Sequence, residues 1–140
     1  MNQGRVLALD LGKRRIGLAL SDELGLTAQG LKTLERTNIR ADLAQLSETI
    51  AQHNVSSILI GNPMHMSGRE GRQAEHAREF GARLQTATGL PVEYWDERLT
   101  TVEAQRVLRA SGISIEKRAK AVDRLAAVIL LESYLDSRRP

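Results

Sequence analysis

Apolar and polar residues follow two different periods along the chain, and the change in period divides it into two halves. In the first half, short apolar runs predict three strands, at Arg5–Asp10, Arg15–Ser21 and Thr27–Leu34. Short segments containing glycine and charged residues separate these runs, as is typical of hairpin turns. The first half therefore predicts an antiparallel meander.

The second half alternates helical patterns with short apolar strands. Apolar residues recur at helical spacing over Ile39–His53 and Glu70–Thr88, and each segment leads into a strand, at Ser57–Gly61 and Val92–Trp95. A helix that connects two strands favours a parallel crossover. Two more helices are predicted in the rest of the chain, at Thr101–Ala110 and Glu116–Leu135. The whole pattern indicates an α/β protein with one mixed sheet covered by helices.

Composition narrows the classes of protein and of chemistry. With 140 residues, 41% of them hydrophobic, the chain suffices for one compact domain over residues 1–140. The absence of cysteine excludes disulfides, thiolate metal sites and a cysteine nucleophile. Because no apolar run approaches the length of a membrane span or a signal peptide, we expect a cytoplasmic protein with no membrane partner. A net charge of +3 and a pI near 9.7 favour a polyanionic partner without requiring one.

Three acidic residues occupy positions that are awkward for folding and useful for chemistry. Asp10 ends an apolar strand, Glu97 follows another, and Asp123 interrupts the apolar stripe of the last predicted helix. An unpaired charge on a packing face costs free energy, so Asp123 needs a partner. If the fold brings the three carboxylates together, they form an oxygen-rich site for a hard divalent cation such as Mg²⁺.

Two of the three acids, Asp10 and Asp123, also have a purely structural explanation. Asp10 and Gly12 could simply form a turn, and Asp123 could pair with a neighbouring arginine or lie in the exposed first turns of its helix. Asp96 and Glu97 would lie on opposite faces of a continuing strand, so at most one of them reaches a shared site. We choose Glu97 because it is nearer the loop edge.

Basic residues accompany these acids. Lys13 and Arg14 lie in the turn after Asp10, and Arg69 and Arg72 lie in a glycine-containing loop before a predicted helix, where a phosphate could be held. The alternative is that they are solvated. Aromatic residues make up only 3% of the chain and offer few platforms for base stacking. We expect the two near the predicted acids to pack in the core; these are Tyr94 and Trp95.

Four motifs follow one another along the chain. They are Leu9-Asp10-Leu11-Gly12, Gly61-Asn62-Pro63, Asp96-Glu97-Arg98-Leu99-Thr100-Thr101 and Asp123-Arg124-Leu125-Ala126-Ala127. Their order and spacing resemble the YqgF family, also called RuvX, over almost the whole chain. The resemblance implies an RNase H-like fold, with a mixed five-stranded sheet flanked by helices. It also implies a catalytic and metal-binding site at Asp10, Glu97 and Asp123.

The resemblance further implies a hydrolase that acts on nucleic acid. Its members are nucleases of pre-16S rRNA, acting in 5′-end maturation during ribosome biogenesis, with one or two Mg²⁺ or Mn²⁺ ions as cofactors. Pre-rRNA is then favoured over a DNA junction as partner, with ribosomal particles as a further partner. On this interpretation the phosphate backbone is held by Lys13, Arg14, Arg69 and Arg72.

Three alternatives remain open on the sequence. A Holliday junction resolvase needs the same acids, and a non-catalytic RNA-binding assembly factor would share the basic residues. A small actin-like nucleotide-binding module could also begin with the turn at Asp10, but the chain shows no second phosphate motif. The residues alone do not distinguish RNA from DNA.

Overall fold

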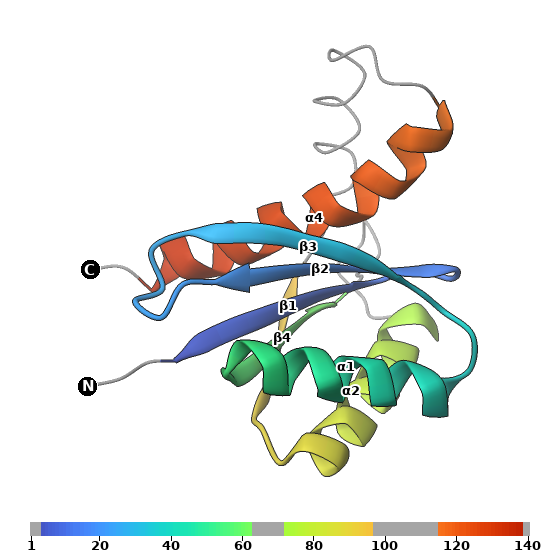
Figure 1. Cartoon of the computed structure of the whole chain (residues 1–140), viewed down its shortest axis with the longest axis horizontal. Coiled ribbons are helices and arrows are strands. Elements are labelled where there is room, and N and C mark those ends of the chain that lie inside the picture. Colours follow the sequence, from blue (N-terminus) through green and yellow to red (C-terminus); the bar gives the residue numbers. More distant parts are fainter. Residues whose placement is uncertain (1–3, 63–71, 97–114, 139–140) are drawn as a thin grey trace.

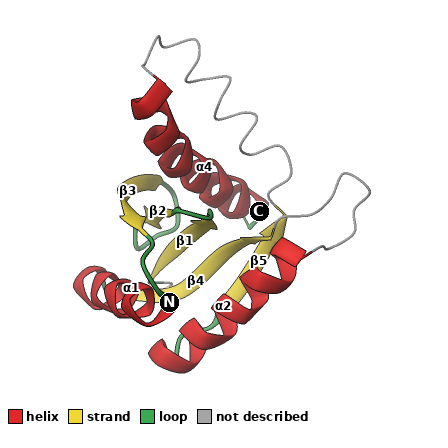
Figure 2. Cartoon of the chain, turned by 90° about the vertical axis from the view of Figure 1, so that its right-hand side faces the viewer, coloured by secondary structure: helices red, strands yellow, loops and turns green. Residues whose placement is uncertain are grey.

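The computed structural model describes residues 4–62, 72–96 and 115–138, and they form one sheet with helices on both faces (Figures 1 and 2). The strands are β1 (Arg5–Leu11), β2 (Arg15–Ser21), β3 (Ala28–Glu35), β4 (Val55–Asn62) and β5 (Val92–Asp96). The helices are α1 (Ile39–His53), α2 (Arg72–Thr88) and α4 (Ile115–Ser137). The helix predicted at Thr101–Ala110 lies outside the described residues. No helix within the described ranges is long and apolar enough to cross a bilayer.

The sheet has the mixed topology that the sequence predicts. Its five strands lie in the order β3-β2-β1-β4-β5. The strands β1, β2 and β3 form the antiparallel meander, whereas β1, β4 and β5 run parallel to one another. The carboxyl ends of three neighbouring strands therefore share one edge of the sheet, which is where open α/β sheets bind ligands.

Successive side chains of the central strand enter different cores. Leu7 and Leu9 pack among side chains of α1 and α2, whereas Ala8 packs under α4. Figure 2 shows the same division, with α4 on one face of the sheet and α1 and α2 on the other. The period-two alternation of β1 thus assigns each of its residues to one helical layer.

The strand β4 begins earlier than predicted. The sequence pattern predicts a start at Ser57, but pairing with β1 begins at Val55, opposite Arg5. The cause is the end of α1, where Asn54 adopts a left-handed conformation with φ of 55° and donates its N–H to the Ile50 carbonyl. This cap stops the helix within one residue, so the chain is extended from Val55 onward.

Candidate active site

Asp10 lies near the carboxyl end of the central strand, on the face that α4 covers. It follows Ala8 by two residues on β1, so it shares that residue's face. The parallel register pairs Leu9 with Ile60 and Ile60 with Tyr94. One residue further along, Asp10 is therefore level with Gly61 of β4 and Trp95 of β5. Gly61 carries no side chain, so β4 places nothing between Asp10 and β5 on this face.

Helix α4 runs antiparallel to β1, and its N-terminal half lies toward the edge that carries Asp10 (Figure 1). At its other end, Leu135 packs beside the turn between β2 and β3, where a Cβ on Gly25 would lie 3.7 Å from its Cδ2 atom. That turn adjoins the start of β1, since the Val6 N–H donates to Ser21 Oγ at 2.8 Å. Nearer the N-terminus of α4, Arg124 packs over β3, because a Cβ on Gly30 would lie 2.5 Å from its Cγ atom.

The helical register places position 123 near the same edge. It precedes Ala127 by one turn and Leu130 by two, and both are buried against the sheet. Tyr134 continues this stripe, and its hydroxyl donates to Glu93 Oε2 of β5 at 2.6 Å. The buried stripe of α4 thus extends from Ala127 to Tyr134, where it contacts β5.

The structure brings Asp10 and the backbone at position 123 to one edge of the sheet, and it leaves the rest of the predicted metal site undescribed. The side chain of Asp123 lies outside the described residues, and so does Glu97, which follows the last residue of β5. Where side chains are described, no cluster of three His, Asp or Glu residues could hold a metal ion. The three-carboxylate site stays a prediction.

The turn after Asp10 is tight and basic. The Gly12 N–H donates to the Arg15 carbonyl at 2.9 Å, and a Cβ on Gly12 would lie 2.7 Å from that carbonyl oxygen. Only glycine fits such an approach without displacing the backbone. Lys13 and Arg14, between these two residues, are exposed. Of the other predicted phosphate contacts, Arg69 lies outside the described residues, and only the backbone of Arg72, the first residue of α2, is described.

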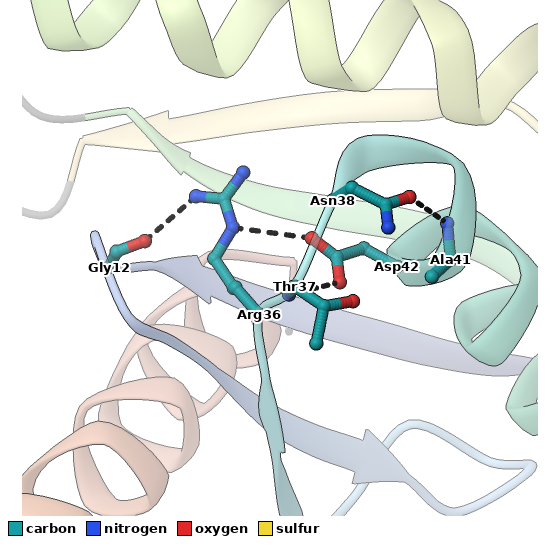
Figure 3. Close-up of polar contacts among 6 residues, drawn as sticks. All are labelled: Gly12, Arg36, Thr37, Asn38, Ala41 and Asp42. Carbon is teal, nitrogen blue, oxygen red and sulfur yellow. Dashed lines mark hydrogen bonds and ion pairs between the residues drawn. The ribbon is translucent and has the colours of Figure 1, made fainter.

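An ion pair with a buried carboxylate lies next to this turn, and sequence reasoning did not find it (Figure 3). Arg36, after β3, donates from Nη1 to the Gly12 carbonyl at 2.8 Å, and its Nε lies 3.5 Å from Asp42 Oδ2. The Asp42 side chain, in the first turn of α1, is 2% exposed. The signal was available, because Asp42 shares the apolar stripe of α1 with Leu46 and Ile50.

The two aromatic residues of β5 pack as expected. Trp95 joins the core under α4, where its ring meets Tyr134 edge-on at 5.5 Å and its Nε1 donates to Ser133 Oγ at 3.1 Å. Tyr94 packs in the other core. Burial, reinforced by the hydrogen bond to Glu93, raises the pKa of Tyr134 to about 12. The rings of Trp95 and Tyr94 therefore serve packing.

Sequence comparison gives a consistent family. A family model described as "RuvX: Holliday junction resolvase" matches residues 4–137. A protein of Koribacter versatilis is 56% identical over 96% of this chain and 88% of its own length. One of Moorella thermoacetica is 48% identical over 94% of each chain. Both carry the name "Putative pre-16S rRNA nuclease".

Comparison with solved structures confirms the RNase H-like fold class. Thermus thermophilus RuvC in complex with a Holliday junction aligns over 99% of each chain with a TM-score of 0.60 at 12% identity. The Fowlpox virus resolvase, also solved with junction DNA, covers 95% of this chain and 97% of its own, with a TM-score of 0.57 at 13% identity. At these identities the likeness concerns the fold alone.

Proposed function

The chain belongs to the RuvX family, and from that premise we propose that it is a metal-dependent endonuclease that matures the 5′ end of pre-16S rRNA in the cytoplasm. The names of its relatives support the RNA substrate. The observation that carries the proposal is the position of Asp10, at the carboxyl end of the central strand and on the α4 face. We expect Asp123 of α4 to lie at the same edge.

The proposed site comprises Asp10, Glu97 and Asp123. Glu93 and Trp95 both contact α4 residues, so period-two alternation carried one step beyond β5 predicts Glu97 on the same face. Three carboxylates fit one or two Mg²⁺ or Mn²⁺ ions, because hard cations prefer oxygen ligands. When bound, such ions lower the pKa of the attacking water and stabilise the leaving 3′ oxygen.

The protein supplies orientation and charge. Asp10 belongs to a strand paired on both sides, with β2 and with β4, so its backbone position is rigid. In the adjoining turn, Lys13 and Arg14 present two exposed cations to the phosphate backbone. We expect Arg69 and Arg72 to extend this surface from the segment that leads into α2. Contacts of this kind position the substrate without reading its sequence.

A second candidate function is resolution of Holliday junctions, which the family description favours. A resolvase cuts two strands symmetrically and therefore acts as a dimer with two sites. A third candidate is an assembly factor that binds RNA or ribosomal particles without cutting. The three differ in substrate, in oligomeric state and in their dependence on Asp10.

One experiment separates them. Purified protein is incubated with labelled RNA that carries the 5′ precursor segment of 16S rRNA and, in parallel, with a four-way DNA junction. Each substrate receives Mn²⁺ or EDTA, and each is tested with the Asp10→Asn variant. A matched control is Glu132→Gln, which removes an exposed carboxylate from the far half of α4.

Cleavage of the RNA alone, lost in EDTA and in Asp10→Asn but retained in Glu132→Gln, is the expected result. Junction cutting by a dimer would move the assignment to DNA resolution. Binding without cleavage in any arm would contradict the nuclease and leave the assembly factor.

A further inference from the structure

Asp42 is a buried carboxylate, and among the described residues its partners belong to the segment that enters α1. Its Oδ1 accepts the Thr37 N–H at 3.1 Å, and its backbone N–H donates to the Asn38 carbonyl at 2.9 Å. Its position in the first turn of α1 adds the favourable helix dipole. These contacts hold the carboxylate at one place, with Oδ2 directed toward Arg36.

Arg36 connects this fixed carboxylate to the turn beside Asp10. Different nitrogens serve the two partners, with Nε toward Asp42 and Nη1 donating to the Gly12 carbonyl. The guanidinium carbon also lies 5.5 Å from the ring centroid of Phe80, which is buried. Because the guanidinium is planar and rigid, fixing Nε and the ring contact also fixes the direction of Nη1.

The basic turn is consequently tied at three points. The Gly12 N–H bonds to the Arg15 carbonyl, the Arg36 N–H donates to the Arg14 carbonyl at 2.8 Å, and Arg36 Nη1 holds the Gly12 carbonyl. The first two bonds are between backbone groups and survive any substitution at position 36 except proline. The third bond is therefore the only one of the three that a substitution of the Arg36 side chain removes.

We propose that Arg36, oriented by Asp42, is a positioning residue that holds the turn of Lys13 and Arg14 in the geometry that binds the phosphate backbone next to Asp10. This inference rests on the proposed nuclease function and adds to it a group that contacts no substrate. Gly12 follows Asp10 by two residues, so the same bond also fixes the end of β1. Because Arg36 acts through the turn, its proposed role differs from that of a residue that contacts phosphate directly. It also differs from that of a residue in a purely structural ion pair.

The test uses the full chain with Arg36→Met, Arg36→Lys and the control Arg83→Met, which removes one exposed arginine from α2. Each substitution is also made in a background that carries Lys13→Ala and Arg14→Ala. Affinity for a short labelled single-stranded RNA is measured in EDTA, where no cleavage occurs. Hydrogen exchange of the Gly12 amide and the kcat and KM on precursor RNA are measured in parallel.

If the proposal holds, Arg36→Met weakens RNA binding about fivefold in the natural background and less than about twofold when the turn cations are absent. Exchange of the Gly12 amide becomes about tenfold faster, while amides in the centre of β4 are unchanged. Arg36→Lys keeps the charge but not the fork, so it restores little of the affinity. Arg83→Met has no such coupling.

Equal losses in both backgrounds would make Arg36 a direct phosphate contact and overturn the proposal. A general fall in stability with unchanged affinity would overturn it too, by leaving only a structural ion pair. If Arg36→Met fails to fold, the double variant with Asp42→Asn replaces it, because an amide still accepts the Thr37 N–H without a buried charge. If the natural chain cleaves the RNA but the effect of Arg36→Met does not depend on the turn cations, this inference alone is refuted. If the natural chain neither binds nor cleaves the RNA, the proposed function is refuted as well.

Discussion

At the scale of single residues, the stability of α1 depends on how one buried charge is compensated. A carboxylate removed from water costs several kcal/mol unless charged groups and donors surround it. The Asp42 side chain is 2% exposed and contacts Arg36 and the Thr37 N–H. The pair is thus a condition for burying this face of α1.

Removing the carboxylate should destabilise the protein strongly. We expect Asp42→Ala to lower the free energy of unfolding by about 2–3 kcal/mol, since both a charged hydrogen bond and the partner of Arg36 are lost. Urea denaturation measures this change. The exposed Glu48→Ala substitution on the same helix is the control and should change stability by less than about 0.5 kcal/mol. Equal effects of the two substitutions would contradict the prediction.

Tyr134 predicts a loss of stability at alkaline pH. Its pKa is about 12 in the folded protein, above the ordinary value of 10.0, because burial and the bond to Glu93 favour the neutral phenol. Between these two values the folded state holds a proton that the unfolded state has released, so stability falls as pH rises through the window. Denaturation curves from pH 9 to 12 should show this fall, and Tyr134→Phe should reduce its slope.

At the scale of elements, the contact between α2 and β5 depends on a glycine in a helix. Gly81 faces Tyr94, and a Cβ at this position would overlap the Tyr94 hydroxyl oxygen and lie 3.1 Å from Cδ1 of Ile60. Glycine inside a helix ordinarily costs about 0.5–1 kcal/mol relative to alanine. At this position the glycine, despite that cost, permits a close approach of α2 and the sheet.

Gly81→Ala should therefore destabilise the protein, against the usual helix preference. Overpacking of a filled core costs about 1–3 kcal/mol, which exceeds the gain in helix propensity. Thermal and urea denaturation measure the balance. Tyr94→Phe removes the overlapping oxygen, so the double variant should recover part of the loss. A stabilised Gly81→Ala protein would show that α2 can move outward freely.

At this scale, a feature could be predicted from the sequence when the residues that determine it lie close together along the chain. Local patterns predicted the meander and the parallel strands, because periodicity and turn chemistry act over a few residues. The start of β4 was missed because it depends on the left-handed cap at Asn54. Arg36 was missed because its contact with Gly12 joins residues that are far apart in sequence. Of the proposed site, the side chain at position 123 and Glu97 remain predictions.

At the scale of the whole molecule, the modest net charge of +3 makes the location of cations decisive. Phosphate contacts release counterions. For single-stranded nucleic acid, each contact therefore lowers the logarithm of the affinity by about 0.7 for every tenfold rise in salt concentration. We expect Lys13→Ala with Arg14→Ala to reduce the slope of log affinity against log salt concentration by about 1.4. Titrations of labelled RNA from 50 to 300 mM KCl would measure the slope. An unchanged slope would exclude this turn from the interface.

The order in which the layers appear along the chain has a consequence for biosynthesis. The meander is complete at Glu35, yet its face with Ala8 and Ala19 is covered by α4, a helix that begins at Ile115. At about 5–20 residues per second, a ribosome needs about 4–16 s to synthesise the residues between Glu35 and the start of α4. The nascent sheet thus exposes an apolar surface until α4 has been synthesised. Chains that terminate before α4 should be captured by chaperones or degraded, whereas chains that include α4 should complete folding.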